Sequence, residues 1–238
     1  MLSGLALAKE PATQAELDAL AARAAYAELL ERAEDVPAGS RLDAWRAVVT
    51  KAAAAVVSHR SAGVPFADAA KAEALRERYR FLADQPSFIA ARDDAVVAGA
   101  EACVKEAEEA PCWKTLGAFE KTLGAGGSLA LGKLLQKSGF RAGRVLPVFA
   151  RAVTSKDAPS CRDPDVQGAT VDALEFPAVD AATARTVAFE LCWTAMMPKL
   201  RAAMVGASSA RMQNACKAMR EKKALTELQA ELCTDEGQ

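Results

Sequence analysis

The sequence has few aromatic residues, a single histidine and no long apolar run. Aromatic residues make up 5% of its 238 positions, and valine and isoleucine rarely alternate with polar residues as half-buried strands require. No apolar stretch reaches the ~20 residues that a membrane-spanning helix needs. The single histidine is His59, and no two cysteines have the close spacing of a zinc-binding pair. We therefore expect neither sheets nor a metal site, and the sequence names no catalytic residue and no cofactor.

Alanine dominates the composition instead. Roughly a quarter of the residues are alanine, the strongest helix former. Capping residues, prolines and glycines divide the chain into about nine predicted helices. A capping box at Thr13 to Glu16 begins the first helix, which we expect to end near Asp35. The sequence thus predicts an all-α fold, with helices packed in an orthogonal or bundle-like arrangement.

We predict one all-helical domain over residues 12–234 and a frayed tail at 235–238. The helical period disappears near 154–179, where prolines and aspartates accumulate, so this segment is predicted to be a long loop. Residues 1–11 are predicted to be a flexible N-terminus. Within it, 6–8 reads Ala-Leu-Ala, which fits either the remnant of a trimmed signal peptide or a frayed end. The first interpretation implies a periplasmic or secreted protein, and a cytoplasmic protein is the alternative.

One stretch resembles a phosphate-binding loop. Gly127, Gly132 and Lys133 have the glycine and lysine spacing of such a loop. The next residue is Leu134, however, where a metal-binding serine or threonine is required, and no buried strand precedes the glycines. We interpret the stretch as an interhelical turn followed by a helix that Ser128 caps.

Charge is distributed unevenly along the chain. Residues 1–112 carry a net charge of −5, residues 113–156 a net +7 and residues 157–238 a net −3, and Glu120 is the single acid of the middle segment. Such a segment favours an anionic or peptide partner, although basic residues paired with acids elsewhere in the fold remain an alternative. The candidate partner-binding residues are Lys114, Lys121, Lys133, Lys137, Arg141, Arg144 and Arg151.

These patterns favour a non-enzymatic binding or scaffold protein, with a protein or peptide as its partner. A first alternative is a protein that binds an anionic membrane surface through the cationic amphipathic helices predicted at 128–153. A second is a helical enzyme whose pocket the sequence does not reveal. The basic segment lacks interleaved tyrosine or tryptophan beyond Trp113 and the isoelectric point is about 6.0, which disfavours nucleic-acid binding. The oligomeric state stays open.

Six cysteines permit three disulfides without requiring them. An antiparallel hairpin of the last two helices would bring Cys216 and Cys233 within disulfide distance, because they lie symmetrically about the polar turn at 221–224. Cys103 and Cys112 can pair only if their helix ends early, near 108–111; otherwise each pairs with Cys161 or Cys192. Six buried, reduced thiols are the alternative, and the hairpin symmetry favours the oxidised form.

One pair of adjacent carboxylates stands out on the helix predicted after Ser87. Asp93 and Asp94 point about 100° apart on a helix, and Arg92 offers one of them a local partner. We interpret them as part of a solvated face rather than as a metal-diphosphate site.

Overall fold

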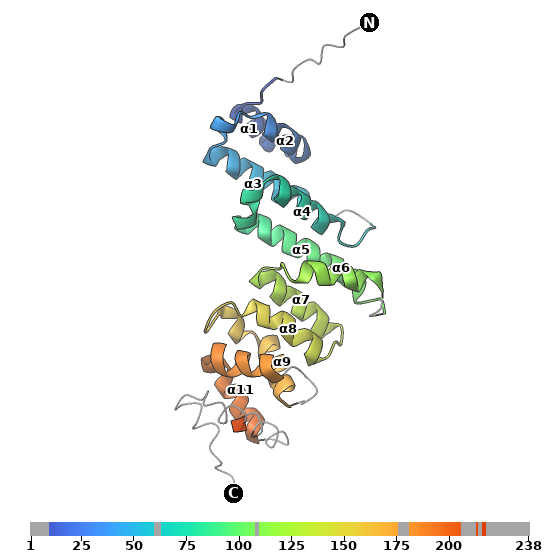
Figure 1. Cartoon of the computed structure of the whole chain (residues 1–238), viewed down its shortest axis with the longest axis vertical. Helices are drawn as coiled ribbons and strands as arrows, with labels where there is room; N and C mark the ends of the chain where they lie inside the picture. The colour runs from blue at the N-terminus through green and yellow to red at the C-terminus, as the bar shows by residue number, and fades with distance from the viewer. Residues whose placement is uncertain are drawn as a thin grey trace. The chain divides into compact units, whose positions relative to one another are not determined.

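The computed structural model describes residues 10–59, 63–107, 110–175 and 181–205, together with 213, 216 and 217. Those ranges contain eleven α-helices joined by short 3₁₀ and π turns, and no strand occurs in them (Figure 1). The predicted all-α class is confirmed, with a few more helices than the nine expected. The termini predicted as flexible lie largely outside the described residues.

The chain divides into two compact units, residues 1–119 and 120–238. Within each unit, helices pack mainly against their neighbours in the chain, as they do in helical repeat proteins. The single domain predicted over 12–234 stays a prediction, because two compact units can belong to one domain.

Unit 1 contains five complete helices and most of a sixth: α1 (Gln14–Ala22), α2 (Tyr26–Arg32), α3 (Asp43–Ser58), α4 (Ala67–Arg78), α5 (Pro86–Cys103) and α6 (Pro111–Glu120). The long central helix α3 packs against α1, α2, α4 and α5. Alanines and valines line its buried face, so neighbouring helices approach closely. The Nε1 of Trp45 and the hydroxyl of Tyr79 donate to carbonyl oxygens of Ala33 and Leu30, at 3.0 and 2.8 Å, which satisfies their polar atoms within the core.

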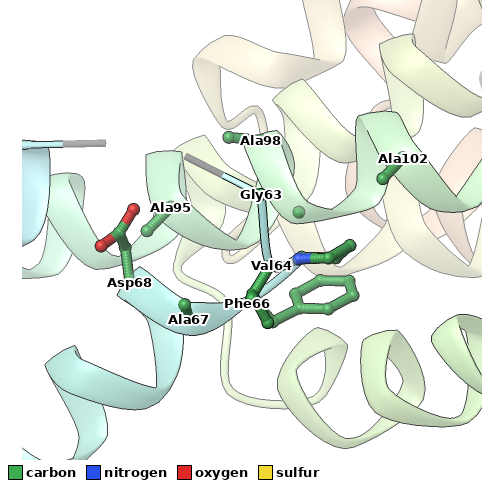
Figure 2. A pocket seen from close by; sticks show the side chains of 10 residues that line it. Gly63, Val64, Phe66, Ala67, Asp68, Ala95, Ala98 and Ala102 are labelled. Carbon is green, nitrogen blue, oxygen red and sulfur yellow. The ribbon is translucent and has the colours of Figure 1, made fainter. Parts of the chain in front are cut away.

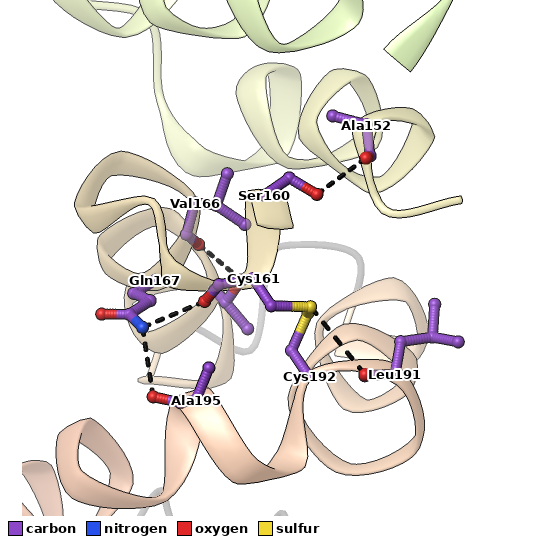
Figure 3. Close-up of a disulfide and its surroundings, with 9 residues drawn as sticks. Ala152, Ser160, Cys161, Val166, Gln167, Leu191, Cys192 and Ala195 are labelled. Atoms are coloured by element: carbon purple, nitrogen blue, oxygen red, sulfur yellow. Dashed lines mark hydrogen bonds between the residues drawn. A yellow bond between two sulfur atoms is a disulfide. The ribbon is translucent and has the colours of Figure 1, made fainter. Parts of the chain in front are cut away.

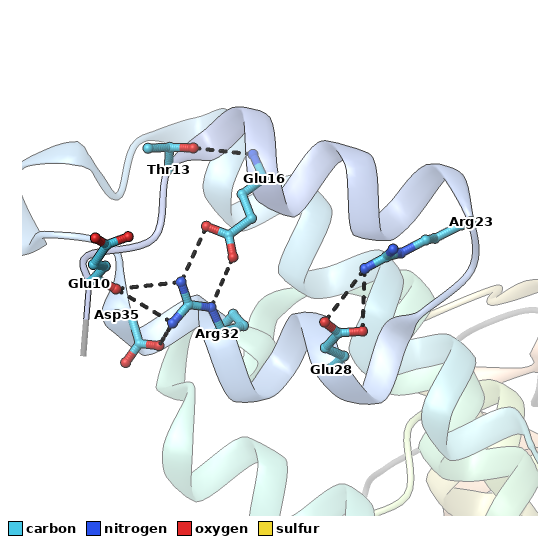
Figure 4. A network of polar contacts seen from close by, with 7 residues as sticks. All are labelled: Glu10, Thr13, Glu16, Arg23, Glu28, Arg32 and Asp35. Carbon is cyan, nitrogen blue, oxygen red and sulfur yellow. Dashed lines mark hydrogen bonds and ion pairs between the residues drawn. The ribbon is translucent and has the colours of Figure 1, made fainter. Parts of the chain in front are cut away.

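The predicted first helix is in fact two. Thr13 caps α1 as expected, with its hydroxyl accepting from the amide of Glu16. The helix then breaks at Ala24, whose φ of 56° is incompatible with a right-handed helix. Arg32 of α2 links the two helices by donating to Glu16 of α1 at 2.9 Å, and it also donates to Asp35, in the turn after α2, at 2.8 Å (Figure 4). The hydrogen bond from Arg32 lowers the pKa of Glu16.

Unit 2 contains α7 (Ala125–Lys137), α8 (Ala142–Ala152), α9 (Pro164–Glu175), α10 (Ala181–Arg185) and α11 (Trp193–Val205). A π-helical turn, Thr186–Leu191, connects α10 with α11. The core of unit 2 is formed by the apolar faces of these helices, including Leu131, Leu135, Leu146, Phe149 and Val166.

The prediction of a long loop near 154–179 is wrong. A 3₁₀ turn, Pro159–Arg162, and α9 occupy most of this segment. Pro164 is the first residue of α9, where proline costs no hydrogen bond, and the carboxylate of Asp163 accepts from the amide of Asp165 at 3.0 Å. The prolines and aspartates of this stretch therefore begin helices instead of preventing them.

The glycine-rich stretch near Lys133 lies inside a helix. α7 begins at Ala125, three residues before the predicted cap Ser128, and runs through Gly127 and Gly132 without interruption. Gly132 lies against the ring of Phe149 on α8, and a methyl group there would overlap that ring. The glycine thus permits close packing of α7 on α8, which explains its presence without a phosphate ligand.

Two disulfide-bonded cysteine pairs occur in the described residues. Cys103 pairs with Cys112, with a Cα–Cα distance of 5.5 Å, and Cys161 pairs with Cys192, at 5.2 Å. The first pair is possible because α5 ends at Cys103 itself, so that no continuous helix separates the two cysteines. Within the described parts of the chain no cysteine is free.

The third predicted pair is only partly described. Cys216 is buried and disulfide-bonded, whereas Cys233 lies outside the described residues, so their pairing stays a prediction. Among the helices that the structure describes, none is long and apolar enough to cross a membrane.

We expect the two described disulfides to stabilise the fold unequally. Their sequence separations are 9 and 31 residues. Loop-closure entropy then gives about 2.6 kcal/mol for Cys103–Cys112 and about 3.7 kcal/mol for Cys161–Cys192. Urea unfolding followed by circular dichroism, on the C103S/C112S and C161S/C192S variants, measures both losses. A larger loss for C103S/C112S would contradict the expected order.

Candidate functional site

Three of the seven predicted partner-binding cations are engaged within unit 2. Lys133 on α7 pairs with Asp163, with an Nζ–Oδ2 distance of 2.6 Å, and lies 3.8 Å from Asp165. Arg144 and Arg151, two turns apart on α8, both bind Glu120. The alternative interpretation of the basic segment, in which its charges pair with acids of the fold, therefore holds for these three.

Glu120 is the centre of the strongest of these contacts. Its side chain is 10% exposed. Arg144 donates to it from both terminal nitrogens, with 2.6 Å between Nη2 and Oε2, and Arg151 donates to Oε1. Burial raises the pKa of the Glu120 carboxyl, but the hydrogen bonds from the two arginines outweigh it and hold the pKa below its ordinary value. The single acid of the basic segment is thus a structural counter-ion.

The other four predicted cations are exposed. Lys114 lies on α6 in unit 1, whereas Lys121, Lys137 and Arg141 belong to unit 2. None of the four has a partner among the residues that the structure describes. Lys137 ends α7 and Arg141 immediately precedes α8, so both lie at the turn that joins these helices.

The apolar faces of α7 and α8 are buried in unit 2. Leu131 and Leu135 of α7 and Val145, Leu146, Val148 and Phe149 of α8 are all almost fully inaccessible. Membrane binding through these faces, the first alternative from the sequence, would require the two helices to leave the core.

A groove in unit 1 was missed by sequence analysis. It has a volume of about 310 Å³ and lies between the turn before α4 and one face of α5 (Figure 2). Small residues spaced along α5 form one wall, and the turn forms the other. The lining residues on α5 are Ala95, Ala98, Gly99 and Ala102, those of the turn are Gly63, Val64, Pro65 and Phe66, and those at the start of α4 are Ala67 and Asp68.

Phe66 determines the shape of this groove. Its φ of 65° places a bulky residue in the left-handed region, which is rare for phenylalanine. Its ring packs where Gly99 has no side chain and stacks on Phe119, with 5.7 Å between the ring centroids. Val64, two residues before Phe66, is 67% exposed.

Carboxylates flank the apolar wall. Asp94 and Glu101 each precede a lining alanine of α5, are exposed, and have no partner in the described part of the chain. Asp68 lines the groove itself and pairs with Lys71, with an Nζ–Oδ1 distance of 3.0 Å. The arrangement can accept an apolar side chain in the groove and positive charges at its edge.

The solvated face predicted at Asp93 and Asp94 is only half correct. Asp94 is exposed, but Asp93 is buried and pairs with Arg92, with an Nη2–Oδ1 distance of 2.7 Å. The pair forms between adjacent residues because both side chains lie on the inner side of α5.

Within the described ranges, no three histidine, cysteine, aspartate or glutamate side chains gather as metal ligands would. The expectation of no metal and no cofactor stays a prediction. Comparisons with protein-family models, with curated proteins and with solved structures find no match for this chain.

We expect the ion pairs of Glu120 to make the free energy of unfolding depend on pH. Since the folded-state pKa of Glu120 lies below its ordinary value of 4.5, the ionised carboxylate stabilises the fold above that value. This contribution is lost as the pH falls through the lowered folded-state pKa. E120Q should therefore lower the free energy of unfolding by about 1–3 kcal/mol at pH 7, and by less near pH 3.

Urea unfolding at several pH values measures this difference. The control is E190Q, which changes an exposed glutamate of unit 2 that has no partner among the described residues. A loss in E120Q that stays constant from neutral to acid pH would show that ionisation of Glu120 is not responsible.

Proposed function

We propose that this chain is a non-enzymatic binding protein that captures an amphipathic, positively charged peptide segment of another protein in the unit 1 groove. One observation carries the proposal: an apolar groove of about 310 Å³ lies beside the carboxylates of Asp94 and Glu101, neither of which has a partner in the described residues. Charge complementarity favours a basic partner over an acidic or neutral one.

The size of the lining residues supports a helical or extended peptide as the occupant. Ala95, Ala98 and Ala102 share one face of α5 and form one wall of the groove. Because their side chains are small, a leucine-sized side chain of a partner can approach the helix backbone. The exposed Val64 adds apolar surface at the opposite wall. Such a site binds through apolar burial and uses the flanking charges for specificity.

We also propose that the protein is periplasmic or secreted. The two described disulfide pairs are compatible with an oxidising compartment. A cytoplasmic protein with the same cysteines reduced is the alternative.

A second candidate function is the one that the sequence predicts, an anionic or peptide partner on the basic 113–156 segment. The exposure of Lys121, Lys137 and Arg141 in unit 2 favours it. The internal pairing of Lys133, Arg144 and Arg151 reduces the available charge, so we rank this surface below the groove.

We expect A98W to weaken binding of a fluorescein-labelled peptide composed of leucine and lysine, because the indole fills the groove. Loss of roughly tenfold or more in affinity is expected, since anchor side chains in pockets carry most of the binding energy. Fluorescence anisotropy measures it. The matched control is A90W, an exposed alanine of the same helix that does not line the groove.

D94N and E101Q should each weaken the same complex by roughly 0.2–1 kcal/mol at low salt, and the difference should shrink as salt is added. The groove assignment is wrong if A98W binds the leucine–lysine peptide as tightly as the unaltered chain.

A labelled peptide composed of leucine and glutamate tests the second candidate. K121E/K137E/R141E should abolish its binding, whereas K51E, an exposed lysine of α3, should not. K133E and R144E are avoided because they would place a second acid beside Asp163 or Glu120 and lower stability. If the triple variant still binds this peptide, the basic segment is not the site.

A further inference from the structure

A second cavity, of about 290 Å³, lies in unit 2 beside the Cys161–Cys192 disulfide. Asp157, Cys161 and Arg162 form one wall, Thr194 and Ala195 at the start of α11 form the other, and Gln167 of α9 lies between them. Four of these six lining residues are polar or charged, which distinguishes this cavity from the apolar groove of unit 1.

Covalent and hydrogen bonds hold the two walls at a fixed separation. The disulfide joins Cys161 to Cys192, which directly precedes α11, and the amide of Asp157 donates to the carbonyl of Leu191 at 2.7 Å. The side-chain nitrogen of Gln167 donates to the carbonyls of Cys161 and Ala195, at 3.0 and 3.1 Å, and so contacts both walls (Figure 3). The cavity is therefore preorganised, which lowers the entropic cost of binding.

Gln167 presents an unused acceptor. Its side chain belongs to a residue that is only 8% exposed, and both hydrogens of its amide nitrogen are engaged. The amide oxygen Oε1 accepts from no described residue and points away from the two carbonyls in Figure 3. A side-chain carbonyl oxygen without a protein donor can accept a hydrogen bond from a ligand with an N–H or O–H group.

Opposite charges line the same cavity without pairing. Asp157 and Arg162 are exposed, and neither has an ion-pair partner in the described part of the chain, including each other. An arginine binds a carboxylate through two parallel hydrogen bonds, and a carboxylate binds an ammonium group. A ligand that carries both charges would satisfy both side chains at once.

We infer that this cavity binds a small zwitterion with a free ammonium group and a free carboxylate, the chemistry shared by amino acids and short peptides. Arg162 holds the carboxylate, Asp157 and the Oε1 of Gln167 hold the ammonium group, and Thr194 lines the opposite wall. This inference is independent of the unit 1 groove, because it uses only residues of unit 2.

The backbone around the cavity is irregular in two places. Asp157 has a φ of 56°. The π-helical turn Thr186–Leu191 ends at Leu191, whose carbonyl accepts the hydrogen bond from the Asp157 amide. Left-handed non-glycine residues and π turns concentrate at binding sites, where they direct side chains that a regular helix could not. Asp157, one of these irregular positions, lines the cavity.

Saturation-transfer NMR on the oxidised, full-length chain tests the proposal. The probes are the twenty free L-amino acids and the dipeptides that carry each of them before alanine, which separates the two ligand sources. We expect at least one probe to bind, and roughly tenfold weaker binding when its ammonium group is acetylated or its carboxylate is amidated.

R162Q and D157N should each reduce binding of that probe by a similar factor. Both side chains are exposed, and asparagine tolerates the left-handed conformation of position 157, so both variants should fold. R201Q, an exposed arginine of α11 outside the cavity, is the control. The inference is overturned if no probe binds, if acetylation or amidation leaves binding unchanged, or if either R162Q or D157N binds as the unaltered chain does.

Discussion

Close approach of a phenylalanine ring to a glycine backbone is the contact on which both units depend. Gly99 accommodates Phe66 in unit 1, and Gly132 accommodates Phe149 in unit 2. In a chain with 5% aromatic residues and a great excess of alanine, helices pack with little side chain between them, and these two rings lie where a side chain is missing. In unit 1 the same contact is part of the groove, since both Phe66 and Gly99 line it.

Part of the uneven charge of the sequence has an internal explanation in unit 2. Glu120 binds two arginines from α8, and Asp163 binds Lys133 from α7. An acid in the midst of a basic segment thus acts as its counter-ion, and the aspartate that caps α9 neutralises Lys133 of α7. Of the remaining exposed cations, Lys137 lies in the last turn of α7, where a positive charge complements the helix dipole.

The fold class could be predicted from composition, and the start of α1 from the capping box at Thr13. The segment near 154–179 could not, because proline and aspartate both break helices and begin them, and Asp163 and Pro164 do the latter. The Cys103–Cys112 pair could not be assigned from the sequence either, because it needs α5 to end at Cys103, several residues before Pro111.

The candidate sites were less predictable than the fold. The groove includes Phe66 in a left-handed conformation, and the polar cavity lies beside the π-helical turn Thr186–Leu191. The residue types at these positions favour regular structure, so the sequence does not indicate either conformation. Charge counting found the basic residues but could not assign Glu120 and Asp163 to them, since those pairs are separated by 24 or more positions in the chain.

The two described disulfides each close within one unit, and this has a consequence for the maturation of the chain. Cys103 and Cys112 are separated by only 9 positions, so they can pair as soon as this segment of the chain has been synthesised. The Cys161–Cys192 bond cannot form until Cys192, which follows α10 in the chain, has been synthesised. Oxidation can then proceed in the direction of synthesis, with unit 1 covalently complete while unit 2 is still being extended.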